Sequence, residues 1–358
     1  MANLSNWGNR LHSGETSYPI IAQRKRWFAF STTLVVLAIL VLVFKGLAPG
    51  IEFKGGTSYT LSNVSGQSLT TAETVVKDQF PAQEPSVFTV GPQIQVELGT
   101  IDQADVDALG AKLAEAYNIP LTDVSSSFIG PSWGQDVTSK AIKSLVVFLV
   151  LVTIVMTVYF RAWRMAVAGL GALLHDLLFT AGIYALSGFQ VTPATVIGFL
   201  TILGYSLYDT VVVFDKVKEN TAELLSQHRF TYDELANLAV NQTLVRSINT
   251  SVVALLPVSA ILFIGSYLFG AGTLKDLSLA LFVGMAVGTY SSIFVATPLE
   301  VALRDTEPRI KQHTADVLAL RTSGGSDVVR PDGSVRVGAL VAGHHQGTTA
   351  QPKRKPRK

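Results

Sequence analysis

Long apolar runs alternate with polar segments along this 358-residue chain. A run of about 20 residues can cross a membrane as a helix, because a rise of about 1.5 Å per residue then matches a hydrocarbon layer of about 30 Å. Runs of this kind are expected at residues 27–44, 141–160, 165–186, 195–214, 248–269 and 277–298. The pattern predicts a polytopic α-helical membrane protein with six spans.

The first run, Trp27 to Phe44, follows a basic cluster at residues 24–26. Cleaved secretory signals also begin with basic residues, but their apolar core is usually about 7 to 15 residues long and small residues follow it. An apolar run of 18 residues therefore favours an uncleaved anchor over a signal peptide.

The segment between the first two runs, residues 45–138, is hydrophilic, and its acidic residues outnumber its basic ones. A strand, a helix and a strand are expected at 57–61, 69–80 and 86–90, and the same pattern recurs at 93–98, 103–117 and 122–129. Thr70 and Glu73 have the spacing of a capping box in the first of these helices. The order β-α-β-β-α-β is that of an α+β ferredoxin-like domain.

Basic residues indicate the orientation, because cytoplasmic loops of membrane proteins are enriched in lysine and arginine. Arg161 and Arg164 lie in the short turn between the second and third runs, whereas the connection 187–193 has no charge. We therefore expect both termini in the cytoplasm and the ferredoxin-like domain on the outer face of the membrane. The polar segment 215–245 is expected along the inner surface, with a capping box at Thr231 and Glu234.

Residues 1–26 and 304–358 form the two cytoplasmic ends in this topology. The C-terminal segment loses all periodicity and ends in the basic sequence PKRKPRK. A disordered solvated tail is the expected state, and a site for anionic lipid or ribosomal RNA is the alternative.

Composition narrows the possible chemistry. Only 15% of the residues are charged and 48% are hydrophobic, whereas an ordinary soluble domain has about 25% charged residues. The absence of cysteine excludes disulfides and thiolate chemistry. The only adjacent histidines, His344 and His345, lie in the low-complexity tail, so neither a metal nor another cofactor is expected. No P-loop or nucleophile elbow is present, so no hydrolytic energy source is encoded and no enzyme is expected.

Asp209 is an ionisable residue inside the fourth apolar run, within the sequence GYSLYDTVVVFDKVKEN at 204–220. A carboxylate at this depth is costly and usually faces a bundle interior or a wet cavity on an ion or proton pathway. A structural hydrogen bond made by a permanently neutral aspartate is the alternative.

Four further polar residues are expected near the depth of Asp209. Arg246 opens the fifth span, Asn249 follows it, and His175 and Asp176 lie in the middle of the third span. A carboxylate paired with an arginine stays ionised, and one separated from it in apolar surroundings takes up a proton. Helix rearrangement would thus bind and release protons. A static salt bridge remains the alternative for Arg246, and His175 need not face the relay, because adjacent helical residues point about 100° apart.

Packing features favour a closely packed bundle. Small side chains recur every four residues in the sixth span, at Ala280, Gly284, Gly288 and Ser292, which lets another helix approach closely. Pro257 removes a backbone hydrogen bond in the fifth span and predicts a hinge there. Both features also occur in static bundles.

Several sequences at fitting intervals resemble one known family. GYSLYDTVVVFDKVKEN is followed by TLVRSINTS at 243–251 and SLALFVGMAVGTYSSIFVATPL at 278–299, and LHDLLFTAGI at 174–183 and IGPSWG at 129–134 agree. Over about residues 26–300 the chain resembles the SecF family of bacterial protein-export subunits, within the resistance-nodulation-division superfamily of proton-driven transporters. One departure is Glu52-Phe53-Lys54-Gly55-Gly56, where the family usually has Asp-Phe-Thr-Gly-Gly.

The resemblance implies half of a twelve-span transporter that pairs with SecD and acts with the Sec translocation channel. It implies that the proton-motive force is used to pull unfolded polypeptides outward through the lipid bilayer. Asp209 would be the titrating carboxylate and Arg246 its partner, and Asp176 lies in the family's His-Asp motif. No specific nucleic acid is implied as a partner. A half-size exporter of lipids or small molecules and a non-transporting translocon scaffold are the alternatives.

Overall fold

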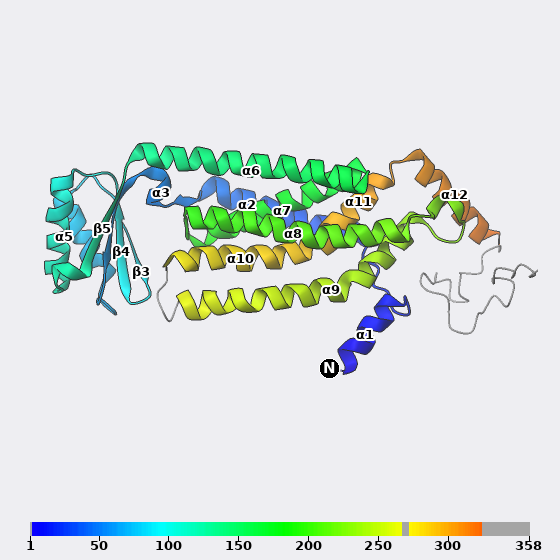
Figure 1. Cartoon of the computed structure of the whole chain (residues 1–358), viewed down its shortest axis with the longest axis horizontal. Helices are drawn as coiled ribbons and strands as arrows, with labels where there is room; N and C mark the ends of the chain where they lie inside the picture. The colour runs from blue at the N-terminus through cyan, green and yellow to red at the C-terminus, as the bar shows by residue number, and fades with distance from the viewer. Residues whose placement is uncertain (1, 267–271, 324–358) are drawn as a thin grey trace, which may run out of the picture.

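The computed structural model describes residues 2–266 and 272–323, which form an elongated helical bundle with an α/β domain at one end (Figure 1). Six helices are long and apolar enough to cross a membrane. They are α2 (Arg24–Phe44), α6 (Pro131–Phe160), α7 (Trp163–Ser187), α8 (Pro193–Asn220), α9 (Tyr232–Ala260) and α10 (Gly272–Ser291). Helix α9 continues as the π-helix η3 (Ile261–Ser266), and α10 continues as the π-helix η4 (Ser292–Ala296) and then α11 (Thr297–Arg304).

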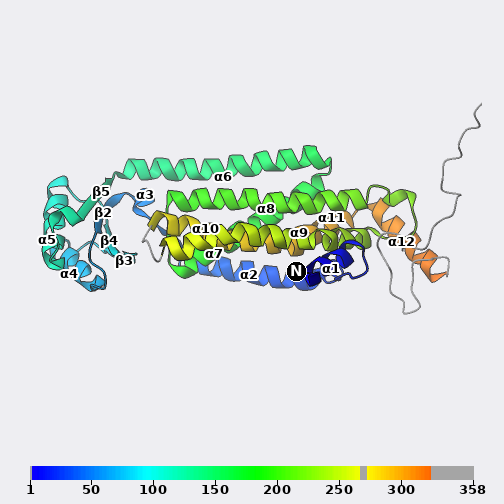
Figure 2. The ribbon, with the colours of Figure 1, turned by 60° about the horizontal axis from the view of Figure 1, so that its bottom comes forward.

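The helices α7, α8 and α10 form the centre of the bundle, and the apolar spanning windows of α2, α6 and α9 surround them with few buried residues. Figure 2 shows α6 along one edge of the bundle and α2 on the other side. We call the end that carries the α/β domain the domain end, and the other end the α12 end. The main apolar core lies between α7, α8, α9 and the end of α10, where Leu173, Val213, Phe214, Ala239 and Ile293 are buried.

The α/β domain follows the predicted order. Its elements are β2 (Gly56–Leu61), α4 (Leu69–Gln79), β3 (Ser86–Val90), β4 (Gln93–Leu98), α5 (Gln103–Tyr117), the 3-10 turn η1 (Leu121–Asp123) and β5 (Val124–Ile129). The sheet has the order β3-β4-β2-β5 with every pair antiparallel. Tyr59, Leu61, Val96 and Leu109 belong to its buried core. The expected capping box at Thr70 and Glu73 is wrong, because Ser68 is the N-cap and Thr70 lies inside α4.

The boundary between this domain and the second span is at residue 130 and not at 138. Helix α6 begins at Pro131 and runs without a break into the membrane segment. Its first turns pack against the short helix α3 (Ile51–Lys54) so closely that a side chain at Gly134 would lie 2.6 Å from the Phe53 carbonyl oxygen. The polar residues 132–140 therefore belong to the same helix as the second span, although most of their side chains are exposed.

A second contact joins the domain to the bundle. Strand β1 (Ala48–Pro49) pairs in parallel with β6 (Gln190–Val191), which lies between α7 and α8. Between α3 and β2 the chain turns at Gly55 and Gly56, whose φ angles are 77° and 151°. A side chain at Gly56 would collide with the Leu98 carbonyl, so the turn requires glycine there.

Residues 215–245 end helix α8 and begin helix α9, which continues directly into the fifth span. Thr231 caps α9 through the predicted capping box with Glu234. The N-terminal helix α1 (Ala2–His12) and the loop after it pack on the polar first turns of α9. Asn241, for example, is fully buried and accepts a hydrogen bond of 2.8 Å from the Tyr18 backbone.

The expected disordered tail is also wrong in part. Helix α12 (Pro308–Thr322) follows α11 and lies at the end of the molecule opposite the α/β domain (Figure 1). Ile310, His313 and Val317 are buried on one of its faces, and Arg321 forms an ion pair of 2.6 Å with Glu234 of α9. The sequence 324–358, including PKRKPRK, lies outside the described residues.

Candidate functional site

Asp209 lies on α8 inside the bundle with 5% of its surface exposed. Its Oδ1 atom accepts a hydrogen bond of 2.7 Å from Ser247 Oγ of α9. Its Oδ2 atom accepts a hydrogen bond from Ser292 Oγ at the start of η4. Both carboxylate oxygens are therefore held by hydroxyl groups from neighbouring helices.

Asp176 of α7 has the same kind of surroundings and no exposed surface. Its Oδ2 atom accepts hydrogen bonds of 2.5 Å from Ser206 Oγ of α8 and 2.8 Å from Ser291 Oγ of α10. Its Oδ1 atom lies 3.0 Å from Nδ1 of the neighbouring His175. Asp209 and Asp176 are thus both buried, and each is contacted by two serines from other helices.

His175 is buried beside Asp176 and faces aromatic side chains. Its ring stacks at 6.4 Å from Phe179 and lies 6.3 Å from Tyr290. Its Nε2 atom is buried and has no hydrogen-bond partner among the described residues.

Arg246 lies apart from the two carboxylates. Its side chain is exposed and donates a hydrogen bond of 3.3 Å to the hydroxyl of Tyr208, the residue before Asp209. Among the contacts of the described residues, Arg246 forms no ion pair with Asp209, whose oxygens are occupied by serines. Asn249 is exposed one turn further along α9 and contacts neither carboxylate. The structure therefore places these two predicted residues on the surface of the bundle.

The small-residue stripe of the sixth span packs directly on α8. A side chain at Gly288 would lie 2.9 Å from Ser206 Cβ, and one at Gly198 of α8 would lie 2.9 Å from Ala280 Cβ. Gly284 packs against Ile202 in the same way. Close approach of these helices brings Ser206, Ser291 and Ser292 to the two carboxylates. Pro257 lies inside α9, four residues before η3 begins.

Sequence reasoning missed Ser206 and Ser291, and it assigned Ser292 only to packing. Ser247 directly follows Arg246 in the sequence, but its role as a donor to Asp209 was not predicted. The sequence feature that could have identified these residues is the adjacent pair Ser291-Ser292 in the middle of an apolar run, because two consecutive hydroxyl groups there need polar partners.

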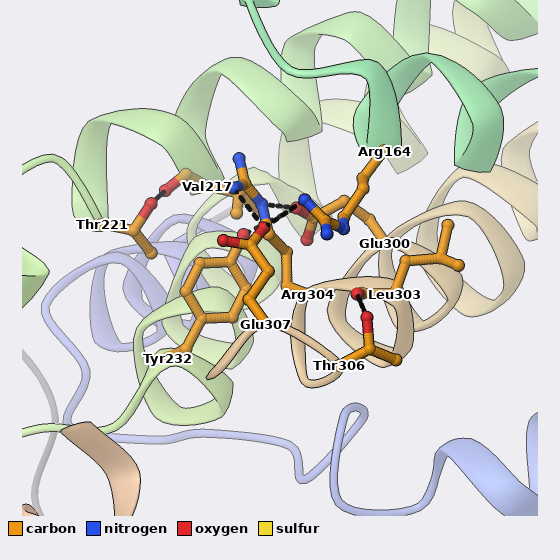
Figure 3. Close-up of polar contacts among 9 residues, drawn as sticks. All are labelled: Arg164, Val217, Thr221, Tyr232, Glu300, Leu303, Arg304, Thr306 and Glu307. Carbon is orange, nitrogen blue, oxygen red and sulfur yellow. Dashed lines mark hydrogen bonds and ion pairs between the residues drawn. The ribbon is translucent and has the colours of Figure 1, made fainter. Parts of the chain in front are cut away.

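A second polar cluster, also missed, lies at the α12 end (Figure 3). Glu300 of α11 is fully buried and accepts hydrogen bonds of 2.7 Å from the Tyr232 hydroxyl and 3.2 Å from Arg304 Nε. Glu307 accepts from both Arg304 and Arg164 at 2.8 Å. These contacts join the first turns of α7 and α9 to α11 and to the residue before α12. Arg164 and Arg304 lie far apart in the sequence, so their shared pairing with Glu307 is evident only once the helices are packed.

At the domain end, a cavity of about 480 Å³ separates the open face of the sheet from the ends of α7, α8 and α10. Glu97 of β4 lines this cavity with 6% of its surface exposed and accepts a hydrogen bond of 2.6 Å from Gln190 of β6. Burial raises the pKa of Glu97 to about 7. The carboxylates of Glu52 and Asp276 also raise this pKa, and the hydrogen bond from Gln190 opposes them.

Buried carboxylates inside a six-span bundle, together with an α/β domain at one end, define the class of membrane transport subunits. Comparisons with known proteins agree with this class. Residues 109–306 match the model of the protein export membrane protein SecD/SecF C-terminal family, and residues 40–62 match that of the SecD/SecF GG motif. The second match contains Gly55 and Gly56.

Individual relatives narrow the assignment. The chain is 44% identical to the protein translocase subunit SecF of Streptomyces coelicolor, over 96% of this chain and 91% of the relative. It is 43% identical to SecF of Mycobacterium tuberculosis, over 91% of this chain and 76% of the relative. The crystal structure of Thermus thermophilus SecDF is similar with a TM-score of 0.70 and 31% identity, covering 82% of this chain and 39% of that one. The chain belongs to the SecF family.

Proposed function

We propose that this SecF-family subunit uses the proton-motive force, together with SecD, to drive the export of polypeptides, and that Asp209 takes up and releases the proton. The observation that carries the proposal is the pair of carboxylates, Asp209 and Asp176, buried among the spanning helices and contacted by serine hydroxyls. The oxygens of Asp209 are held by serine hydroxyls and by no arginine or lysine among the described residues. Ionisable residues in a bundle interior usually belong to ion or proton pathways.

The proposed orientation places the α12 end in the cytoplasm and the α/β domain outside the cytoplasmic membrane. It is supported by the concentration of basic side chains at the α12 end, which includes Arg24, Arg164, Arg304 and Arg321. Protons entering from the outside would then reach Asp176 and Asp209 from the domain end, and the two chain termini would lie inside.

The proposed SecD contact is the exposed face formed by α8 and α9. Thr201, Gly204 and Tyr208 are exposed along one stripe of α8, and Arg246 and Asn249 are exposed on the neighbouring α9. Polar and charged groups of this kind rarely face lipid and are usually covered by another helix. Support also comes from the single-chain SecDF of Thermus thermophilus, which is 34% identical over 77% of this chain. This chain covers only 37% of that protein, so the remainder of that chain is available to pack on this part.

In this arrangement Arg246 faces the partner subunit. It is linked to the neighbourhood of Asp209 by its hydrogen bond to Tyr208, the residue before Asp209. An arginine on such a surface can pair with a carboxylate of the partner, or it can turn toward Asp209 when the helices move. The translocation channel and the unfolded polypeptide would contact the α/β domain, which is the only large part of the described chain beyond the bundle.

The test is the variant Asp209→Asn, which keeps the shape and hydrogen bonding of the side chain but cannot ionise. We expect normal accumulation with SecD and loss of gradient-stimulated export of a presecretory protein into vesicles. The matched control is Asp215→Asn, because Asp215 is an exposed carboxylate on the same helix. Export that stays dependent on the gradient in Asp209→Asn would contradict the proposal, and export independent of any gradient in the native chain would favour a scaffold.

A further inference from the structure

Two consecutive serines serve two different carboxylates. Ser291 Oγ donates to Asp176 of α7, and Ser292 Oγ donates to Asp209 of α8. Adjacent residues of a helix point about 100° apart, so neighbouring positions can face different helices. Among the described contacts, the sixth span is therefore the one helix that donates side-chain hydrogen bonds to both carboxylates.

Each of these serines also has a second acceptor within reach. Ser291 Oγ lies 3.2 Å from the Gly288 carbonyl, and Ser292 Oγ lies 3.0 Å from the Thr289 carbonyl. A hydroxyl has one hydrogen to donate and two lone pairs to accept with. Its one hydrogen therefore cannot make a full, linear hydrogen bond to the carboxylate and to the carbonyl at the same time.

Which of the two acceptors the hydroxyl bonds depends on the charge of the carboxylate. An ionised carboxylate only accepts, so the serine donates to it and leaves the backbone carbonyl. A protonated carboxyl can donate, so the serine can accept from it and turn its own hydrogen to the carbonyl. Both charge states then keep their buried polar atoms paired. By contrast, Ser206 and Ser247 have only the carboxylate as an acceptor among their described contacts.

The backbone changes its helical form at the same two residues. Helix α10 ends at Ser291, and the π-helix η4 begins at Ser292. Thr297 Oγ1 donates a hydrogen bond of 3.1 Å to the Ser292 carbonyl. Single π turns inside α-helices are rare and are found mostly at functional sites. The change of helical form therefore coincides with the two serines that contact the carboxylates.

We propose that Ser291 and Ser292 are positioning residues for proton exchange, each switching its hydroxyl between a carboxylate and a backbone carbonyl as Asp176 or Asp209 loses or gains a proton. The proposal rests on the proton-coupled function proposed above and adds Asp176 as a second proton-binding position. It assigns no bond making or breaking to the serines beyond exchange of hydrogen bonds.

Other ionisable groups surround this site and must be considered in any titration. His175 lies beside Asp176 on α7, and Tyr205 and Tyr208 flank Asp209 on α8. Arg246 lies on α9, and Tyr290 lies on α10 next to His175. The four tyrosine and histidine side chains remain unchanged in the variants below, so a difference between variants reports on the serines.

The test measures gradient-driven export as a function of the pH inside the vesicles, with SecD and the channel present. In Ser292→Ala the ionised carboxylate loses one of two hydroxyl donors, so proton release becomes harder. We expect the pH of half-maximal rate to rise by about one unit or more. Ser291→Ala should shift the profile in the same direction through Asp176. Ser292→Thr retains a hydroxyl and should restore the native midpoint.

The matched control is Ser278→Ala. Ser278 is a buried serine of the same helix whose hydroxyl donates to the Lys275 carbonyl and to no carboxylate. We expect this variant to leave the midpoint unchanged. An equal fall in rate at every pH for Ser291→Ala or Ser292→Ala, without a shift in midpoint, would mean that the serines only pack, and would overturn the proposal.

A second measurement does not depend on export. Infrared titration of the purified full chain can follow the carboxylic C=O band that disappears in Asp209→Asn. This band should titrate about one pH unit higher in Ser292→Ala and should stay in place in Ser278→Ala. If Asp209→Asn abolishes gradient-driven export but neither Ser291→Ala nor Ser292→Ala shifts the pH midpoint of export or of the infrared band, only the positioning role of the serines is refuted. If Asp209→Asn exports normally, the proposed function fails first.

Discussion

The packing of α8 against α10 leads to a sharp prediction at Gly288. An alanine there would place its Cβ atom 2.9 Å from Ser206 Cβ and 3.1 Å from Ser206 Oγ. Unstrained carbon atoms are about 3.5 to 4.0 Å apart. The two helices would therefore have to separate by about 0.6 to 1 Å at this level. The perturbation is local, but it acts on the residue that donates to Asp176.

The magnitude follows from two opposing effects. Alanine stabilises a helix relative to glycine by about 1 kcal/mol. Overpacking of a close contact costs about 1 to 3 kcal/mol. We therefore expect Gly288→Ala to be neutral to about 2 kcal/mol destabilising. The hydrogen bond of 2.5 Å from Ser206 to Asp176 should lengthen as the helices separate, so gradient-driven export should fall more than stability does.

Gly204 provides the matched control, because it lies on α8 and a side chain there would meet nothing within 4 Å. Gly204→Ala should gain about 1 kcal/mol in the purified chain. The assay is thermal unfolding of both variants in detergent, followed by export with SecD present for Gly288→Ala. The reasoning is refuted if Gly288→Ala is as stable as Gly204→Ala and exports at the native rate.

Two further predictions concern the domain end and the exposed face. The pKa of Glu97 is raised from 4.5 to about 7, so the folded state binds this proton more tightly than the unfolded state. Stability should therefore fall by up to about 3 kcal/mol as the pH rises from about 4.5 to about 7. Glu97→Gln should remove this dependence in thermal unfolding, whereas Glu115→Gln, on the exposed side of α5, should retain it. Arg246→Met should leave the unfolding temperature of the purified chain unchanged, because the side chain is exposed and makes one hydrogen bond of 3.3 Å. The same variant should abolish gradient-driven export as fully as Asp209→Asn, and losses that multiply in the double variant would show that the two residues act independently.

The sequence by itself determined the spans and the α/β domain. Within residues 2–266 and 272–323, each predicted apolar run lies in a helix. The elements β3, β4 and α5 begin and end at the predicted residues. These features depend on hydropathy and on local periodicity, which neighbouring residues set regardless of the rest of the chain. Asp176 and Asp209 could be singled out for the same reason, because a carboxylate in an apolar run is visible without any contacts.

Tertiary structure alone decided which groups surround these carboxylates. The expected neighbour of Asp209 was Arg246, but the rotation of α9 turns Ser247 inward and Arg246 outward. The buried Asn241 and the helix α12 show the same limit, since polar residues there became interior through contacts with α1 and α9. Sequence spacing gives the depth of a side chain in a spanning helix, but the direction of the side chain depends on how neighbouring helices pack. In the sixth span it also depends on the π-helix that begins at Ser292, which rotates the residues after it relative to a regular α-helix.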